Sequence, residues 1–285
     1  MDFMSKTPLS NVQGNVMVNG PRAMVNMNDG NAGGGSRLSR NFVANTCRVS
    51  GDHGAYNSWD RMPLANRVAS GGGAGTFANS LTEVSRSMII GNYGSSQGFD
   101  NDDGSSYYNT THNVMYQASG FKMDYGGHDS HFASNLVVAK PDDNFLGTAS
   151  FVPGHASIIT GNTFVGGDDI HVDALFENCD KGCGNGYVDS CRIVTNGNTF
   201  YTPDGLPTAA CDGDDKTRIP LAKLPFGMEA GFTAGKTPSV GVLLGWMREL
   251  LELPPASAAA AGALGSSHPV GALRPAQRLD KALAA

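Results

Sequence analysis

Two phrases of the sequence, HNVMYQ at residues 112–117 and SNLVVA at residues 134–139, share an asparagine that is followed by apolar or β-branched residues. Similar phrases stand elsewhere, namely GNVMVN (14–19), RNFVAN (40–45), GNYGS (91–95), GNTFVG (161–166) and GNTFYT (197–202). From first to last, their asparagines are separated by 26, 51, 21, 22, 27 and 36 residues. A recurring unit with one asparagine at a fixed position is typical of a repeat architecture.

Each unit holds two or three short strand-like runs separated by Gly, Asn and Ser, and it shows no helical periodicity. We therefore expect an all-β fold, a right-handed parallel β-helix (a solenoid) with about 22–27 residues per coil. Successive coils would stack about 4.8 Å apart. The asparagines would form a ladder at one corner, where their tolerance of a left-handed conformation helps the chain to turn. We interpret the 51-residue interval between Asn41 and Asn92 as a Gly-rich excursion from one coil.

The composition excludes several classes of protein. Charged residues make up only 16% and glycine contributes 38 residues, which argues against a helical protein. The net charge of −6 and the absence of a basic patch make nucleic acid an unsuitable partner. No apolar run approaches the roughly 20 residues of a transmembrane segment. The first residues, MDFMSKTPLSNVQGN, lack the apolar region of a secretory signal peptide.

The domain organisation follows from where the repeat ends. All 22 asparagines lie at or before Asn198, so we expect a β-helix domain over residues 1–205. We expect an irregular segment with a short helix over residues 206–253, because VGVLLGWMRELLEL (240–253) has apolar spacing suited to docking. A helix that caps an end of the solenoid is favoured over an oligomer contact. The Ala/Pro-rich residues 254–285 are expected to form a disordered tail.

An acidic position recurs eleven residues after many of the phrase asparagines. The residues found there are Asn26, Asp52, Asp103, Asp124 and Asp173, whereas Leu146 breaks the pattern after Asn135. On adjacent coils, Asp103 and Asp124 would lie about 5 Å apart, so one carboxyl would keep its proton beside an ionised neighbour. Such a pair suits glycoside hydrolysis, with the two residues as acid and as nucleophile or base. The alternative is that these aspartates only cap turns.

Further residues near this acidic position are candidates for catalysis or binding. His53, His128 and Lys122 could carry protons or orient groups. Asp52, Arg48, Trp59 and Tyr108 could contact a substrate, although only one of Tyr107 and Tyr108 is expected to be exposed. A Ca²⁺ ion on Asp102, Asp103 and Asp124 is an alternative use of the acidic residues. A zinc site on His128 and His131 is less favoured, because strand residues at this spacing would point to opposite faces.

The cysteines leave several interpretations open. Cys47 stands alone, whereas Cys179, Cys183, Cys191 and Cys211 cluster in the sequence. Four clustered cysteines could form two disulfides, remain free thiols or bind zinc. Their spacing is not a standard set of zinc ligands. The pairing of disulfides cannot be deduced from the spacing alone.

Three stretches resemble one known superfamily. They are NGPRAMVNMNDGNAGGG (19–35), NTCRVSGDHGAYNSWDRMP (45–63) and DNDDGSSYYNTTHNVMY (100–116). Over residues 10–205 the chain resembles right-handed β-helix proteins of the pectate-lyase-like superfamily, in an uncharacterised carbohydrate-active-like branch. The resemblance implies a groove for an extended glycan and an extracellular or cell-surface location. Since such proteins usually have further coils before the NGPR stretch, we expect Met1 to lie within a longer natural chain.

The resemblance leaves the reaction open. Its hydrolase members use aspartate, and its lyase members use a basic residue, often with Ca²⁺. The leading hypothesis is hydrolysis of a polysaccharide or oligosaccharide by Asp103 and Asp124. One alternative is a non-catalytic glycan-binding or cell-surface solenoid. The other is a lyase or epimerase that acts on uronates, with Arg48 or Lys122 near the substrate carboxylate. No cofactor other than Ca²⁺ is expected, and the oligomeric state, substrate and linkage stay open.

Overall fold

The computed structural model describes part of the chain, and all structural statements concern that part. The described residues are 3–4, 10–27, 35–51, 53–59, 65–67, 76–78, 81–93, 97–123, 127–139, 146–148, 155–166, 192–211, 214–221 and 229–254.

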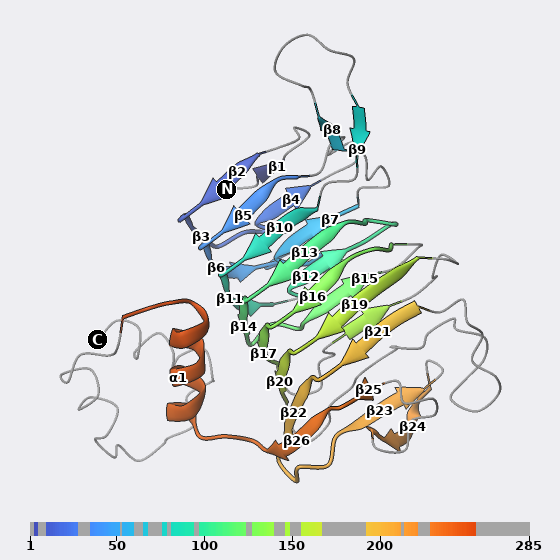
Figure 1. Ribbon diagram of the computed structural model, residues 1–285. Coiled ribbons are helices and arrows are strands. Elements are labelled where there is room, and N and C mark those ends of the chain that lie inside the picture. Colours follow the sequence, from blue (N-terminus) through green and yellow to red (C-terminus); the bar gives the residue numbers. More distant parts are fainter. Residues whose placement is uncertain are drawn as a thin grey trace.

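Most of the described strands belong to three parallel sheets (Figure 1). Sheet A contains β1 (Phe3–Met4), β4 (Val25–Met27), β7 (Tyr56–Ser58), β12 (Phe99–Asn101), β15 (Phe121–Met123) and β18 (Leu146–Thr148). Sheet B contains β2 (Asn11–Gln13), β5 (Arg37–Ser39), β10 (Thr82–Ser85), β13 (Tyr108–Thr111), β16 (His131–Ala133), β19 (Ala156–Thr160), β21 (Arg192–Asn196) and β25 (Glu229–Ala230). Sheet C contains β3 (Val16–Val18), β6 (Phe42–Thr46), β11 (Met88–Asn92), β14 (Val114–Tyr116), β17 (Leu136–Val138), β20 (Thr163–Val165), β22 (Thr199–Thr202) and β26 (Thr233–Lys236).

The chain visits the three sheets in turn. From β2 to β7, and again from β10 to β20, consecutive strands belong to sheets B, C and A, so one circuit of the chain uses three strands. Each strand then pairs in parallel with the strand one circuit earlier, as Leu136 of β17 pairs with Val114 of β14. Parallel pairing with all three sheets in sequence order confirms the expected all-β parallel fold and is compatible with a β-helix. The pairing continues past residue 205, because β26 pairs with β22.

The core fills the space between the three sheets. Alternate strand residues point inward, and the inward residues of all three sheets form one buried apolar cluster. Aromatic rings stack within it, as Tyr56 does on Phe99 at 5.0 Å and Phe164 on Phe200 at 5.2 Å between ring centroids. Each stacked pair joins neighbouring circuits, so the circuits hold one another in register.

A hydrogen-bonded ladder runs along the tight turn from sheet B to sheet C. Each buried ladder side chain accepts a hydrogen bond from the backbone N–H of the ladder residue one circuit earlier, at 2.9–3.2 Å. The ladder residues are Asn15, Asn41, Ser87, Asn113, Asn135, Asn162 and Asn198. The expected ladder is therefore correct except at one position, since Ser87 and not Asn92 belongs to it.

The left-handed residue of this turn is the one before the ladder residue. Arg40, Arg86, His112 and Ser134 have φ between 49° and 57°, and glycine occupies the same place at Gly14, Gly161 and Gly197. The asparagines therefore contribute hydrogen bonds, whereas the left-handed conformation that we assigned to them falls on their neighbours.

The long interval between Asn41 and the next ladder residue contains an excursion, as expected. Two strands, β8 (Ala65–Arg67) and β9 (Thr76–Ala78), pair with each other in antiparallel orientation and stand off from the three sheets (Figure 1). A second antiparallel pair, β23 (Thr208–Cys211) and β24 (Asp214–Pro220), lies near the other end of the described chain.

The expected helix is present as α1 (Val240–Leu250), but it lies along a flank of the sheets and does not cap an end (Figure 1). Its residues Leu243 and Met247, together with Leu251, pack on the outward side chains of sheet C. Because these outward residues are apolar, the sheet offers the helix a long binding surface along its side. No helix among the described residues is long and apolar enough to cross a membrane.

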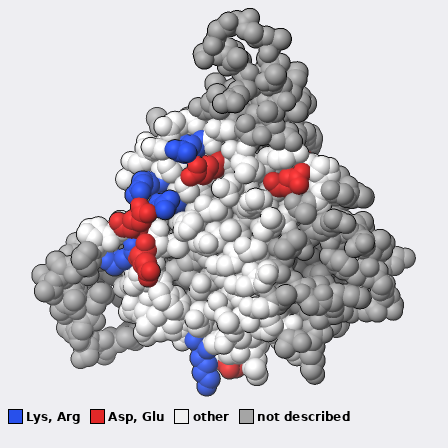
Figure 2. Space-filling model, viewed as in Figure 1, with Lys and Arg blue, Asp and Glu red and all other residues white. Residues whose placement is uncertain are grey.

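Charged side chains fix the end of α1. Glu252 accepts hydrogen bonds from Arg40 at 2.6 Å and Arg86 at 2.9 Å, two residues at the same turn position on neighbouring circuits. Figure 2 shows that the charged side chains of the described residues on this face gather mainly in this region beside α1.

Candidate functional site

A polar row crosses the outward face of sheet A. Asn26, Asn57, Asp100 and Lys122 occupy the same position on β4, β7, β12 and β15, as the strand register shows. Their neighbours in the strands point into the core, so by alternation these four side chains point outward. Even so, Asn26, Asn57 and Asp100 are fully buried.

The ammonium group of Lys122 contacts two carboxylates. Asp100 belongs to the polar row, and Asp102 lies at the edge of sheet A. Lys122 Nζ lies 3.2 Å from Asp100 Oδ1 and 2.9 Å from Asp102 Oδ1. The Asp100 side chain is 0% exposed, whereas those of Lys122 and Asp102 are 19% and 16% exposed. A buried carboxylate is costly unless it is paired, so Asp100 holds Lys122 in place. Asp102 and Lys122 are the members of this carboxylate–lysine cluster that solvent reaches.

A second polar group adjoins the carboxylate–lysine cluster. Gly54 packs so closely on Asp100 that a Cβ atom at residue 54 would lie 2.7 Å from the Asp100 Cβ, so no larger residue fits there. The preceding residue, His53, accepts a hydrogen bond at Nδ1 from Arg22 Nη2 at 3.1 Å, since a guanidinium has no acceptor. The same guanidinium stacks 4.9 Å from the ring centroid of Trp59.

Trp59 and Asp102 lie at the same edge of sheet A. Each directly follows a strand, β7 and β12 respectively, and the Asp102 N–H donates to the Ser58 carbonyl at 2.7 Å. The structure thus brings together His53, Lys122 and Trp59, three residues that the sequence had indicated. It adds Asp100 to them and places Asp102, which the sequence indicated only as a Ca²⁺ ligand, beside Lys122.

The expected pairing of Asp103 with Asp124 is not seen among the described residues. Asp103 follows Asp102 in a turn and has a left-handed φ of 49°, and Asp124 and Asp52 lie outside the described residues, so a Ca²⁺ site on Asp102, Asp103 and Asp124 is not described either. The eleven-residue count began from Asn92 in this circuit, which is not a ladder residue. The described register pairs Asp100 with Lys122, which lie 22 residues apart in the sequence.

One other expectation needs correction, and the expected role of Arg48 stays a prediction. Tyr108 is 2% exposed and belongs to the core, so it offers no surface to a substrate. Its neighbour Tyr107 is the partly exposed tyrosine, as strand alternation allows. Arg48 is exposed in a turn, and the residue beside Trp59 and His53 is Arg22. Cys179, Cys183 and Cys191 lie outside the described residues, and the buried Cys47 thiol donates a hydrogen bond to the His53 carbonyl at 3.2 Å.

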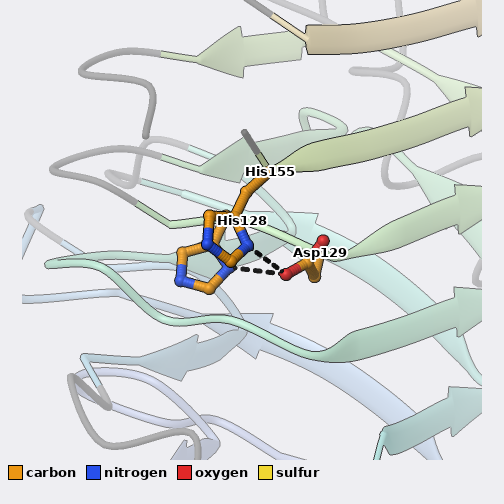
Figure 3. A group of neighbouring side chains, drawn as sticks. All are labelled: His128, Asp129 and His155. Carbon is orange, nitrogen blue, oxygen red and sulfur yellow. Dashed lines mark hydrogen bonds and ion pairs between the residues drawn. The ribbon is translucent and has the colours of Figure 1, made fainter. Parts of the chain in front are cut away.

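A third group of side chains lies at the turn that enters sheet B (Figure 3). Asp129 Oδ2 is 2.9 Å from His128 Nδ1 and 2.6 Å from His155 Nδ1, and the two imidazole rings lie 4.1 Å apart. His128 and Asp129 precede β16, and His155 precedes β19 on the next circuit. Tyr107, which precedes β13, lies edge-on to the His128 ring at 5.4 Å.

The electrostatics of this His–Asp–His cluster follow from those contacts. Burial by itself raises the pKa of Asp129, but hydrogen bonds from His155 and His128 outweigh it and hold the pKa below its ordinary value. Burial, the negative charge of Asp129 and a hydrogen bond to Asp129 raise the pKa of Tyr107. Asp129 is therefore an ionised carboxylate that two imidazoles and one phenol share.

His155 and Asp129 were not among the residues expected from the sequence, although a signal for them exists. His128 and His155 each stand seven residues before a ladder asparagine, and Tyr107 and Asp129 each stand six residues before one. Sheet B and its tight turn contain no insertion in these circuits, so counting backwards from the ladder keeps the register. Counting forwards crosses turns of variable length and loses it.

Comparison with family models, with curated proteins and with solved structures found no match to this chain.

Proposed function

We propose that this chain is a carbohydrate-active right-handed parallel β-helix protein of the pectate-lyase-like kind, which hydrolyses a polysaccharide or oligosaccharide. The observation that supports it is the carboxylate–lysine cluster of Asp100, Lys122 and Asp102 on the outward face of sheet A. An extended glycan lying across the strands would meet Lys122 and Asp102 beside Trp59, whose ring offers a surface for a sugar. With a glycan substrate, we also propose an extracellular or cell-surface location.

The spacing of Asp102 and Lys122 favours a retaining reaction. Asp102 Oδ1 lies 2.9 Å from Lys122 Nζ, which is closer than the acid and base of inverting enzymes, about 6.5–9.5 Å apart. Such a close pair leaves little room for a water molecule between the carboxylate and the anomeric carbon. In this proposal Asp102 is therefore the nucleophile.

Each residue of the cluster then has one task. Asp102 attacks the anomeric carbon while the Lys122 ammonium protonates the departing glycosidic oxygen, which forms a glycosyl ester and a free hydroxyl. Water next attacks the anomeric carbon, its proton passes to Lys122, and the Asp102 carboxylate leaves. Asp100, which is fully buried, is a positioning residue that holds the lysine between the two steps.

The test is a panel of neutral and uronate-containing glycans, assayed for new reducing ends and for absorbance of unsaturated uronates. We expect wild type to release reducing ends and Asp102→Asn to lose at least about 100-fold in rate, the usual contribution of proton-transfer or nucleophilic groups. Asp103→Asn is the matched control, because it makes the same change at the adjacent residue, and asparagine tolerates its φ of 49°.

The other outcomes separate the competing functions. Equal rates for wild type and Asp102→Asn would remove Asp102 from the mechanism. Loss of activity in Asp124→Asn alone would assign the nucleophile to Asp124. Unsaturated products that disappear in Lys122→Met would favour a uronate lyase. Saturable glycan binding without any product, abolished in Trp59→Ala, would favour a non-catalytic glycan-binding protein.

A further inference from the structure

The His–Asp–His cluster has the donor atoms and the spacing of a metal site. One ring nitrogen of His128, one ring nitrogen of His155 and a carboxylate oxygen of Asp129 all lie within 4.8 Å of one another. Ligand atoms held about 2.0–2.2 Å from one Zn²⁺ ion in tetrahedral geometry lie about 3.3 Å apart. Each donor is a single atom on a partly buried side chain, so small rotations bring all three onto a common ion.

The backbone fixes the three donors before any ion binds. Asp129 has a left-handed φ of 51°, which turns its side chain towards His128 and His155. The His128 N–H donates to Ser106 Oγ at 3.0 Å, and the pairing of β16 with β19 sets the position of His155. The ligands therefore come from two neighbouring circuits, and an ion between them would join these circuits.

The donor set indicates the class of ion. Two imidazoles and one carboxylate suit first-row divalent transition metals such as Zn²⁺, whereas Ca²⁺ and Mg²⁺ prefer oxygen donors alone. We propose that His128, Asp129 and His155 bind one such ion, with a coordination position left open. His155 is 40% exposed, so water or another ligand can reach that position. Tyr107, which hydrogen-bonds to Asp129, orients the carboxylate from outside the coordination sphere.

This metal site is independent of the proposed hydrolysis, because it uses none of Asp100, Asp102 and Lys122. It differs from the zinc site that the sequence suggested, since His155 replaces His131. His131 begins β16 and is absent from the cluster, which makes it a matched control.

The experiment uses the full chain, stripped of metal with a chelator, and titrates it with Zn²⁺ or Co²⁺ alone. The clustered cysteines could also bind these ions, so the reference protein carries serine at Cys179, Cys183, Cys191 and Cys211. We expect one equivalent of Zn²⁺ to bind with saturation, and bound Co²⁺ to show visible absorption without the near-ultraviolet charge-transfer bands of thiolate ligands. If the serine background does not fold, the wild-type Co²⁺ spectrum makes the same distinction.

The variants assign the ligands. His155→Ala and Asp129→Ala should weaken Zn²⁺ binding by more than about 100-fold, which exceeds the roughly 10- to 100-fold cost of losing an outer partner. Tyr107→Phe should fall within that smaller range, and His131→Ala should leave the affinity unchanged. The proposal fails if the reference protein binds no Zn²⁺, or if His131→Ala weakens binding as much as His155→Ala. In the first case the three side chains form only a hydrogen-bonded network.

Discussion

At the scale of single residues, the ladder side chains show how one amide can join three circuits. Asn135 Oδ1 accepts hydrogen bonds from the backbone N–H and the Nδ2 of Asn113, and its own Nδ2 donates to the Thr110 carbonyl and to Asn162 Oδ1. All of these groups are buried, so the loss of the amide leaves several of them without a partner.

We therefore predict that Asn135→Ala lowers the free energy of unfolding by about 1–3 kcal/mol, the cost of a buried group left unsatisfied. Asn135→Ser should cost less, because the Ser87 hydroxyl already performs the acceptor role of a ladder residue towards Asn41. Chemical denaturation of the two variants measures the difference. Equal losses of free energy of unfolding in the two variants would mean that side-chain packing, and not the hydrogen bond, is how the ladder residue stabilises the fold.

Between elements, the contact of α1 with sheet C combines an apolar face with one charged contact. Leu243 and Met247 supply the apolar part, and Glu252 joins Arg40 to Arg86 at the end of the helix. The hydrogen bond from Arg40 is the main reason why the pKa of Glu252 lies below its ordinary value, with the charges of Arg86 and Arg40 adding to it.

This lowered pKa predicts how the docking of α1 depends on pH. A carboxyl whose pKa is lower in the folded protein stabilises the fold above its ordinary value of 4.5, and that contribution is lost as the pH falls through the lowered pKa. Trp246 packs on Tyr201, so its fluorescence in a Trp59→Phe background reports whether the helix is docked. We expect the signal to change below pH 4.5, and the change to be absent in Glu252→Gln.

Other charged or ionisable groups lie close to the contact between Glu252 and the two arginines. Arg86, His112, Glu249 and Glu252 line a cavity of about 430 Å³ between the helix and the turns. A fluorescence change below pH 4.5 that persists in Glu252→Gln would contradict the role assigned to Glu252.

At the scale of the whole molecule, each described circuit pairs only with its neighbours. In such an architecture, the free energy of unfolding is approximately a sum of contributions from the units and from the interfaces between adjacent units. A substitution at one interface should therefore destabilise mainly the circuits beside it. Phe164 and Phe200 provide a suitable interface, because both are fully buried and stack on each other.

We predict that Phe164→Ala costs about 3–5 kcal/mol, as do other truncations of buried aromatic side chains. Hydrogen exchange should accelerate most in residues 155–166 and 192–202, and least in residues 10–27, which lie several circuits away. Val16→Ala is the control, because Val16 is 75% exposed and its truncation should change stability by no more than about 0.5 kcal/mol. A uniform loss of protection along the chain would contradict the nearest-neighbour view.

The sequence by itself determined the strand-rich parallel repeat, its corner asparagines and the helix near residue 240, because these depend on local patterns that recur along the chain. It also indicated that His53, Trp59, Lys122 and His128 belong to polar sites. Only the tertiary structure decided which side chains meet. It replaced Asn92 by Ser87 in the ladder, placed Asp100 against Lys122 and brought His155 to Asp129. The reason is that turns of variable length shift the register between sheets, and contacts between circuits depend on that register.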